Sequence, residues 1–392
     1  MSAVRTSARP PPVADIRPDT VLLGLLAVLV GVGVVVVTSA SMELAASRYG
    51  DAYHHLYRHT IYLSLGLCVL AAVALVPTAI WRRVAAPGYF LTLGLLLLVL
   101  APGIGREVNG AMRWVALGPV SFQPSEAAKF LLVLYVAHYL SRRQQEVRTS
   151  FVAMMRPLGW LLIPATLLLA EPDLGATVVI FGAAAGAILL AGARLRDMSV
   201  LLVAGAVALT VLVRAQPYRM ERLRAFLNPW DEEVQYEAGY QLTQALIAFG
   251  RGEWFGVGLG EGLQKLFYLP EAHTDFIFAV IAEELGALAA IAICIAFAVL
   301  VVRGLWHGRA AEVRGDVFAA QLAYGAALML GVQALVSLGV NTGLLPTKGL
   351  TLPLVSYGGN ALVVSCALVG LLLRVDWENR LAAIAGARGL RG

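Results

Sequence analysis

Long apolar runs, separated by short polar stretches, dominate the chain. Each run is about 15–25 residues long, enough for one helix to cross the hydrocarbon core of a bilayer. They begin near Val21, Thr60, Tyr89, Phe130, Leu158, Ala176, Val200, Phe276, Val317 and Leu352. The pattern predicts an all-α, polytopic membrane protein with ten transmembrane helices, the fifth being short and interrupted by Pro164.

The polar stretches divide the chain around this bundle. Residues 1–20, with Arg9-Pro10-Pro11-Pro12, are predicted to form a disordered cytoplasmic tail. The transmembrane domain is expected over 21–377 and a cytoplasmic C-terminal tail over 378–392. A large extracytoplasmic loop, 216–274, should separate the seventh and eighth helices; its amphipathic segment 240–249 could lie in the interface or dip into the bundle. An eighth helix over 276–302 would be about 40 Å long, so it should tilt or project beyond the hydrocarbon.

Composition supports the membrane assignment. Hydrophobic residues make up 59% of the chain and charged residues 14%, whereas a soluble domain has about 25% charged residues. The formal net charge is +5. We attribute this excess to membrane topology and expect no binding to nucleic acid.

Basic residues predict the orientation, because cytoplasmic loops are enriched in them. With both termini inside, the inner tails and loops hold eighteen: Arg5, Arg9, Arg17, Arg82, Arg83, Arg142, Arg143, Arg148, Arg156, Arg194, Arg196, Arg303, Arg309, Arg314, Arg374, Arg380, Arg388 and Arg391. The short outer loops and adjoining helix ends hold six: Arg48, Arg58, Arg106, Arg113, Lys129 and Lys348. Both termini are therefore predicted to be cytoplasmic.

Asp275 is the leading candidate for chemistry. It lies where the long outer loop enters the eighth apolar run, after Pro270, His273 and Thr274. Partial burial near the headgroups would raise the pKa of its carboxyl group, which suits a general base near neutral pH. An equally good interpretation is that Thr274 or Asp275 caps the helix.

Other charged residues have both structural and functional interpretations. Glu126 and Lys129 share a helix face, so they could form a local ion pair, or Glu126 could position Lys129 for an anionic headgroup. Glu283 and Glu284 could lie on an ion pathway, but pairing with Arg and Lys of neighbouring helices is favoured. The turn at Glu171-Pro172-Asp173 could bind a cation or cap the next helix.

Two further motifs are weaker evidence for a binding site. Gly256-Val257-Gly258-Leu259-Gly260 resembles a nucleotide-binding loop but has no preceding strand. His54, His55 and His59 suggest a metal site but lack partners at ligand spacing. We expect no organic cofactor.

Six ordered motifs make the chain, from about Thr38 to Trp377, similar to the SEDS family (shape, elongation, division and sporulation). They are Thr38-Ser39-Ala40-Ser41; Val108-Asn109-Gly110-Ala111 with Arg113-Trp114; Phe122-Gln123-Pro124-Ser125-Glu126 with Lys129; Glu171-Pro172-Asp173-Leu174-Gly175; Tyr268 through Glu284; and Leu345-Pro346-Thr347-Lys348-Gly349-Leu350-Thr351-Leu352-Pro353 running into Ser356-Tyr357-Gly358-Gly359. Asn228-Pro229-Trp230-Asp231 and Gln264-Lys265-Leu266 resemble the division type more than the elongation type. Asn360 departs from the family pattern, which usually has Ser there.

The resemblance implies a peptidoglycan glycosyltransferase that polymerises lipid II at the outer face of the bacterial cytoplasmic membrane, at the division septum. Asp275 would be the general base on the acceptor 4-hydroxyl. Arg106, Arg113, Lys129 and Lys348, or a divalent cation such as Mg²⁺ or Mn²⁺, would neutralise the departing pyrophosphate. Supporting roles are expected for Glu126, Glu171, Asp173, Gln244, His273, Thr274 and Ser356.

The implied partners are lipid II, the nascent glycan strand on undecaprenyl pyrophosphate, a class B penicillin-binding protein acting as transpeptidase, and other divisome proteins. Two alternatives remain open: a lipid II flippase, and a non-catalytic scaffold that activates the transpeptidase. A flippase would place its key charges near the membrane midplane, whereas Glu126, Asp275 and Lys348 are predicted at one face.

Overall fold

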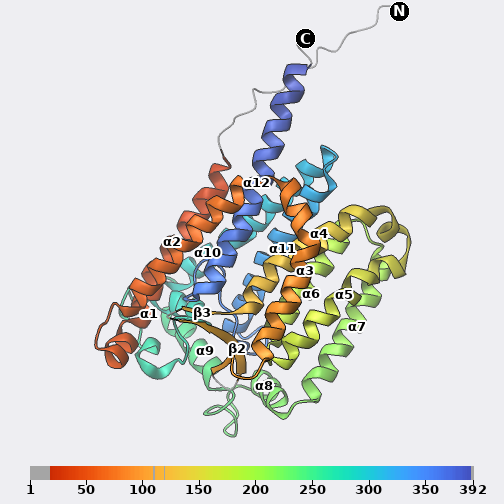
Figure 1. Ribbon diagram of the computed structural model, residues 1–392. Helices are drawn as coiled ribbons and strands as arrows, with labels where there is room; N and C mark the ends of the chain where they lie inside the picture. The colour runs from red at the N-terminus through yellow and green to blue at the C-terminus, as the bar shows by residue number, and fades with distance from the viewer. Residues whose placement is uncertain (1–17, 109–110, 119, 390–392) are drawn as a thin grey trace, which may run out of the picture.

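The structure, a computed structural model, describes residues 18–108, 111–118 and 120–389 (Figure 1). Most of the predicted N-terminal tail and the last three residues of the C-terminal tail lie outside these ranges, as do Asn109 and Gly110 of the second motif.

Ten long helices of the described chain correspond to the ten predicted spans. They are α1 (Thr20–Tyr49), α2 (His54–Leu75), α3 (Thr78–Leu100), α4 (Pro124–Thr149), α5 (Phe151–Ala170), α6 (Leu174–Leu190), α7 (Leu195–Arg214), α10 (Ile277–Val313), α11 (Val317–Asn341) and α12 (Gly359–Gly389). Eight are long and apolar enough to cross a membrane; the other two are α6, which is shorter, and α4, which carries several charges. The polytopic architecture is therefore confirmed.

The second outer loop departs from the all-α prediction. It forms a three-stranded antiparallel sheet of β1 (Gly105–Val108), β2 (Ala111–Leu117) and β3 (Val120–Phe122), in that order. Arg106 of β1 faces Trp114 of β2, and Val115 of β2 faces Phe122 of β3. This segment is too short and too polar to cross the membrane, and strand pairing satisfies its backbone.

The sheet lies at the end of the bundle opposite the projecting end of α12 (Figure 1). Two short helices, α8 (Pro217–Leu227) and α9 (Tyr240–Gly252), and a π-helical turn, η1 (Gln264–Tyr268), belong to the long outer loop. Leu242, Ala245 and Ala248 of α9 are buried, and α9 packs against α10 and α11. Of the two interpretations of 240–249, packing into the bundle is the one observed.

Helix α10 is broken near its beginning. It contains 37 residues, and at Gly286 the backbone leaves the helical conformation (φ 82°, ψ 176°). The freed carbonyl groups of Glu283 and Glu284 accept hydrogen bonds from the backbone of Val257 (2.9 Å) and Gly258 (3.1 Å). The glycine-rich segment that resembled a nucleotide loop therefore completes this break, which the sequence analysis did not predict.

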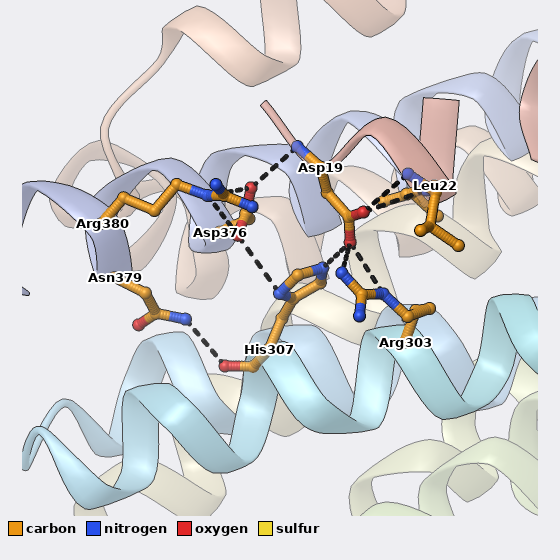
Figure 2. Close-up of polar contacts among 8 residues, drawn as sticks. Asp19, Leu22, Arg303, His307, Asp376, Asn379 and Arg380 are labelled. Carbon is orange, nitrogen blue, oxygen red and sulfur yellow. Dashed lines mark hydrogen bonds and ion pairs between the residues drawn. The ribbon is translucent and has the colours of Figure 1, made fainter. Parts of the chain in front are cut away.

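A buried polar cluster stabilises the end of the bundle opposite the sheet (Figure 2). The carboxylate of Asp19 accepts hydrogen bonds from Arg303 (2.6 and 2.9 Å) and lies 2.8 Å from Nε2 of His307. The backbone N–H of Asp19 donates to Asp376 (3.1 Å), which also pairs with Arg380 (2.9 Å). These contacts hold the start of α1 against α10 and α12.

Candidate functional site

Asp275 lies in the turn that leads into α10. The N–H groups of Asp275 and Phe276 both donate to the carbonyl oxygen of Glu271, at 3.1 and 3.2 Å. Asn341, at the end of α11, donates to the carbonyl oxygen of Asp275 (2.8 Å) and accepts from the N–H of Ala279 (3.1 Å). Two elements far apart in sequence thus fix the backbone on both sides of this carboxylate.

The Asp275 side chain is not used as a helix cap. The capping position of α10 is occupied by Phe276, without a side-chain hydrogen bond, and Thr274 bonds to Glu271 instead. The Asp275 carboxylate makes no hydrogen bond with any other residue that the structure describes. The capping interpretation is therefore wrong, and the carboxylate is available for chemistry.

Burial and charge tune this carboxylate toward proton transfer. Burial raises the pKa of Asp275 to about 7, and repulsion by the Glu271 carboxylate adds to the rise, while Arg113 and Arg222 oppose it. Gly349 allows the opposing loop to approach closely, since a Cβ atom there would lie 3.1 Å from Oδ2 of Asp275. A base with a pKa near the working pH is well suited to accept a proton.

Two cavities meet at Asp275. The first, of about 530 Å³, extends between α2, the sheet and the loop before α12. The second, of about 540 Å³, extends toward α8 and α9. Both are lined by Arg113, Asp173, Glu271, Asp275 and Gly349. A group bound in either cavity could therefore reach the same carboxylate.

Cationic side chains line both cavities. Arg113 bridges the sheet to the turn between α5 and α6 by donating to the carbonyl oxygens of Glu171 (3.1 Å) and Pro172 (2.5 Å). Arg106 lines the first cavity and Lys348 the second. Burial, with repulsion from Arg222, Arg219 and Arg113, lowers the pKa of Lys348 to about 8. These positions can neutralise an anion next to Asp275.

Lys129 lies away from the position expected of a pyrophosphate ligand. Its side chain is 1% exposed, and its ammonium lies 2.8 Å from both Glu126 and Gln333. Lys129 lines neither cavity, whereas Glu126 lines the first. Of the two interpretations, the local ion pair is therefore the one observed, and Glu126 rather than Lys129 lines the cavity.

The two carboxylates of the acidic turn between α5 and α6 lie in different surroundings. Asp173 caps α6 by accepting from the N–H of Ala176 (3.0 Å) and also lines both cavities. Glu171 is fully buried, and neither carboxylate oxygen has a hydrogen-bond partner in the described chain. Burial and the nearby Asp173 raise the pKa of Glu171 to about 8, so this group is mainly protonated at neutral pH.

The remaining predicted residues fall both inside and outside the site. His273 and Thr274 line the first cavity, and the His273 ring lies 5.1 Å from that of His55 and 5.4 Å from that of Tyr357. Ser356 is buried and accepts from the N–H of Leu352 (2.8 Å), which is a loop-stabilising contact. Gln244 lines neither cavity; Gln241, one helical turn earlier, lines the second.

Several cavity residues were not selected from the sequence. The first cavity also contains Arg58, Tyr357 and Asn360, and the second contains Tyr218. Asn360, the departure from the family pattern, donates to the carbonyl oxygen of Ser121 in β3 (2.9 Å). Only the tertiary arrangement brings these residues together, although the position of Tyr357 in the last motif was a usable signal.

Glu283 and Glu284 are paired beside the break in α10, as the favoured interpretation predicted. Glu283 lies 2.6 Å from Arg251 of α9, and Glu284 lies 2.6 Å from Lys265 of η1. Both carboxylates are buried. Their charges are thus used to dock the long loop onto the broken helix.

No group of three or more His, Cys, Asp or Glu side chains within the described residues is arranged to hold a metal ion.

The sequence of this chain is similar to those of known proteins. The sequence model of the FtsW/RodA/SpoVE family, described as "Cell cycle protein", matches residues 19–381. The "Probable peptidoglycan glycosyltransferase FtsW" of Pseudomonas fluorescens is 52% identical over 92% of this chain and 88% of its own. The protein of the same name from Nitrosococcus halophilus is 51% identical over 94% of this chain and 95% of its own.

Solved structures agree with the fold. A chain from "Structural coordination of polymerization and crosslinking by a peptidoglycan synthase complex" has a TM-score of 0.75 and 31% identity, covering 92% of this chain and 98% of that one. The rod shape determining protein RodA of Thermus thermophilus has a TM-score of 0.67 and 30% identity, covering 92% and 96%.

Proposed function

The chain belongs to the FtsW/RodA/SpoVE family of cell cycle proteins, and from that membership we propose that it is a division-type peptidoglycan glycosyltransferase. Its substrate is lipid II, which it polymerises into glycan strands. The observation that carries the proposal is the Asp275 carboxylate, which has no hydrogen-bond partner in the described chain and lies where two cavities meet.

The proposed reaction is an inverting glycosyl transfer. Asp275 accepts the proton of the acceptor 4-hydroxyl as that oxygen attacks the anomeric carbon of the donor. The new C–O bond forms while the bond from the anomeric carbon to the pyrophosphate breaks, and undecaprenyl pyrophosphate leaves. Asp275 then releases its proton to water. The two cavities allow donor and acceptor to approach one carboxylate from different sides.

Charge on the departing pyrophosphate is balanced by cations near Asp275. Arg113 lines both cavities, and Lys348 and Arg222 line the second. Preorganised cations of this kind stabilise charge that develops in the transition state. A divalent ion such as Mg²⁺ or Mn²⁺ would act here as a companion of the pyrophosphate, because Mg²⁺ is commonly held by substrate phosphates together with only one or two carboxylates.

The proposed location is the bacterial cytoplasmic membrane at the septum, with the Asp275 end outside and both termini in the cytoplasm. The distribution of arginines supports this orientation. The proposed partner is a class B penicillin-binding protein, within the divisome. The similarity to a peptidoglycan synthase complex that coordinates polymerisation with crosslinking supports such a pairing.

The test is to incubate the purified full-length protein, together with its cognate transpeptidase, with labelled lipid II. Long glycan strands support the proposal. Absence of strands, combined with movement of lipid II across liposome membranes, would identify a flippase. Absence of both, with stimulation of crosslinking by the transpeptidase, would identify a scaffold.

A further inference from the structure

A third cavity, which is strongly basic, lies at the opposite end of the bundle from Asp275. It has a volume of about 620 Å³ and lies between the beginning of α3, the final turns of α4 and the beginning of α11. Thr78 at the start of α3 donates its backbone N–H to Glu378 of α12 (2.9 Å), which places the cavity beside the projecting end of α12. The arginine distribution assigns this end to the cytoplasm.

The positive charge in this cavity is not neutralised. Arg82, Arg83 and Arg142 line it, and none of them makes a hydrogen bond or ion pair with the described part of the chain. His138 also lines it, and the Nδ1 atom of this ring is buried without a partner. By contrast, the adjacent Arg143 pairs with Glu146 at 2.9 Å. The cavity arginines are thus available to an external anion.

The acidic residue on the cavity wall is already engaged. Asp316 caps α11 by accepting from the N–H of Ala319 (3.0 Å) and lies 3.2 Å from Arg314. Both α3 and α11 begin at this cavity, so the positive ends of two helix dipoles add to the attraction for an anion. The preference for basic residues in cytoplasmic loops explains why arginines occur at this end of the bundle. It does not explain why three of them line the same cavity.

The surroundings of the cavity suit a lipid. Helix α3 exposes large apolar side chains to its surroundings: Ile80, Val84, Phe90 and Leu91. Acyl chains could therefore lie along α3 while a headgroup enters the cavity. Basic pockets between transmembrane helices on the cytoplasmic side are suited to phosphate-bearing headgroups, and the volume lies within the usual range for a bound small molecule.

We propose that this cavity binds the phosphate headgroup of an anionic phospholipid of the inner leaflet, between Arg82, Arg83 and Arg142. Arginine presents several N–H donors to phosphate oxygens. The site is separate from the Asp275 cavities, and the proposal does not rest on the glycosyltransferase activity.

The experiment uses delipidated full-length protein and native mass spectrometry, with cardiolipin, phosphatidylglycerol and phosphatidylethanolamine titrated separately. The wild type should retain the two anionic lipids in preference to phosphatidylethanolamine. The double variant Arg82→Gln/Arg142→Gln should weaken anionic lipid binding by about thirtyfold, from about a fivefold loss for each arginine near the membrane surface. Arg143→Gln is the matched control, because that arginine is exposed but already paired, and it should bind as the wild type does.

Equal affinities for the wild type and the double variant would overturn the proposal. Displacement of the anionic lipids by millimolar inorganic phosphate would also overturn it, because the site would then take a soluble phosphate. Melting curves check that the variants fold. Should the double glutamine variant not fold, Arg82→Lys/Arg142→Lys, which keeps both charges, must retain the preference for anionic lipids.

Discussion

Gly286 lets α10 break, and its replacement tests how the break supports the site. In Gly286→Ala the new Cβ atom would lie 2.4 Å from the backbone nitrogen of Gly256 and 2.5 Å from the carbonyl oxygen of Trp254. The backbone conformation at this position is one that glycine alone adopts readily. The neighbouring atoms belong to backbone, so they cannot move aside as a flexible side chain could.

The expected cost combines backbone strain and overpacking. Holding a non-glycine residue in such a conformation costs about 1–3 kcal/mol, and forced contacts in a packed interior add about 1–3 kcal/mol. The free energy of unfolding should therefore fall by about 2–6 kcal/mol. For a chain of this length, the average unfolding entropy per residue converts this loss to a fall in Tm of roughly 2–7 °C.

The assay is thermal unfolding of purified protein in detergent, followed by lipid II polymerisation at a temperature where the variant is folded. Polymerisation should also fall, because the short first part of α10 directly follows Asp275. Gly94→Ala is the matched control: it replaces a helical glycine around which a new Cβ would meet nothing within 4 Å. A Gly286→Ala variant that melts and polymerises like wild type would refute the reasoning.

Three further predictions follow from the charged groups. Polymerisation should rise with pH up to about 7, where Asp275 loses its proton, and fall again above about 8, where Lys348 loses its positive charge; a pH–rate profile without the rise would contradict the assigned base. Lys348→Gln should lower polymerisation about tenfold or more by removing a cation beside the pyrophosphate, whereas Lys348→Arg should retain most activity; equal loss in both would indicate a shape requirement instead. Lys129→Met should destabilise the fold by about 3–5 kcal/mol by leaving Glu126 unpaired, and adding Glu126→Gln should restore part of the loss in a melting assay; additive losses would show that the two are not coupled.

The spans were predictable because each needs only a long apolar run, and membrane helices satisfy their own backbone hydrogen bonds. The sheet was missed because its strands are short; the Asn109-Gly110 pair between two short segments is a hairpin signal that could have revealed it. The break in α10 could not be derived from one helix alone, since its hydrogen bonds are completed by residues 253–258 of the long loop.

A site residue could be predicted from the sequence where its role depends on its position along the chain. It could not be predicted where its role depends on the direction in which the folded structure orients its side chain. Asp275 was identified from a polar residue entering an apolar helix. Lys129 and Glu126 share one helix face, so their spacing could not say which one would face the cavity. Gln244 and Gln241 lie one turn apart on α9, and only the packing of that helix on α10 and α11 selects Gln241.

The most direct test of the central claim is lipid II polymerisation by Asp275→Asn, compared with Glu271→Gln. Both changes remove one carboxylate from the walls of the same two cavities, but only the first removes the proposed base. The account predicts folded Asp275→Asn protein that makes no glycan strands, while Glu271→Gln retains polymerisation with its pH dependence shifted to lower pH, because repulsion by Glu271 raises the pKa of Asp275. Strand synthesis by Asp275→Asn at the wild-type rate would contradict the account.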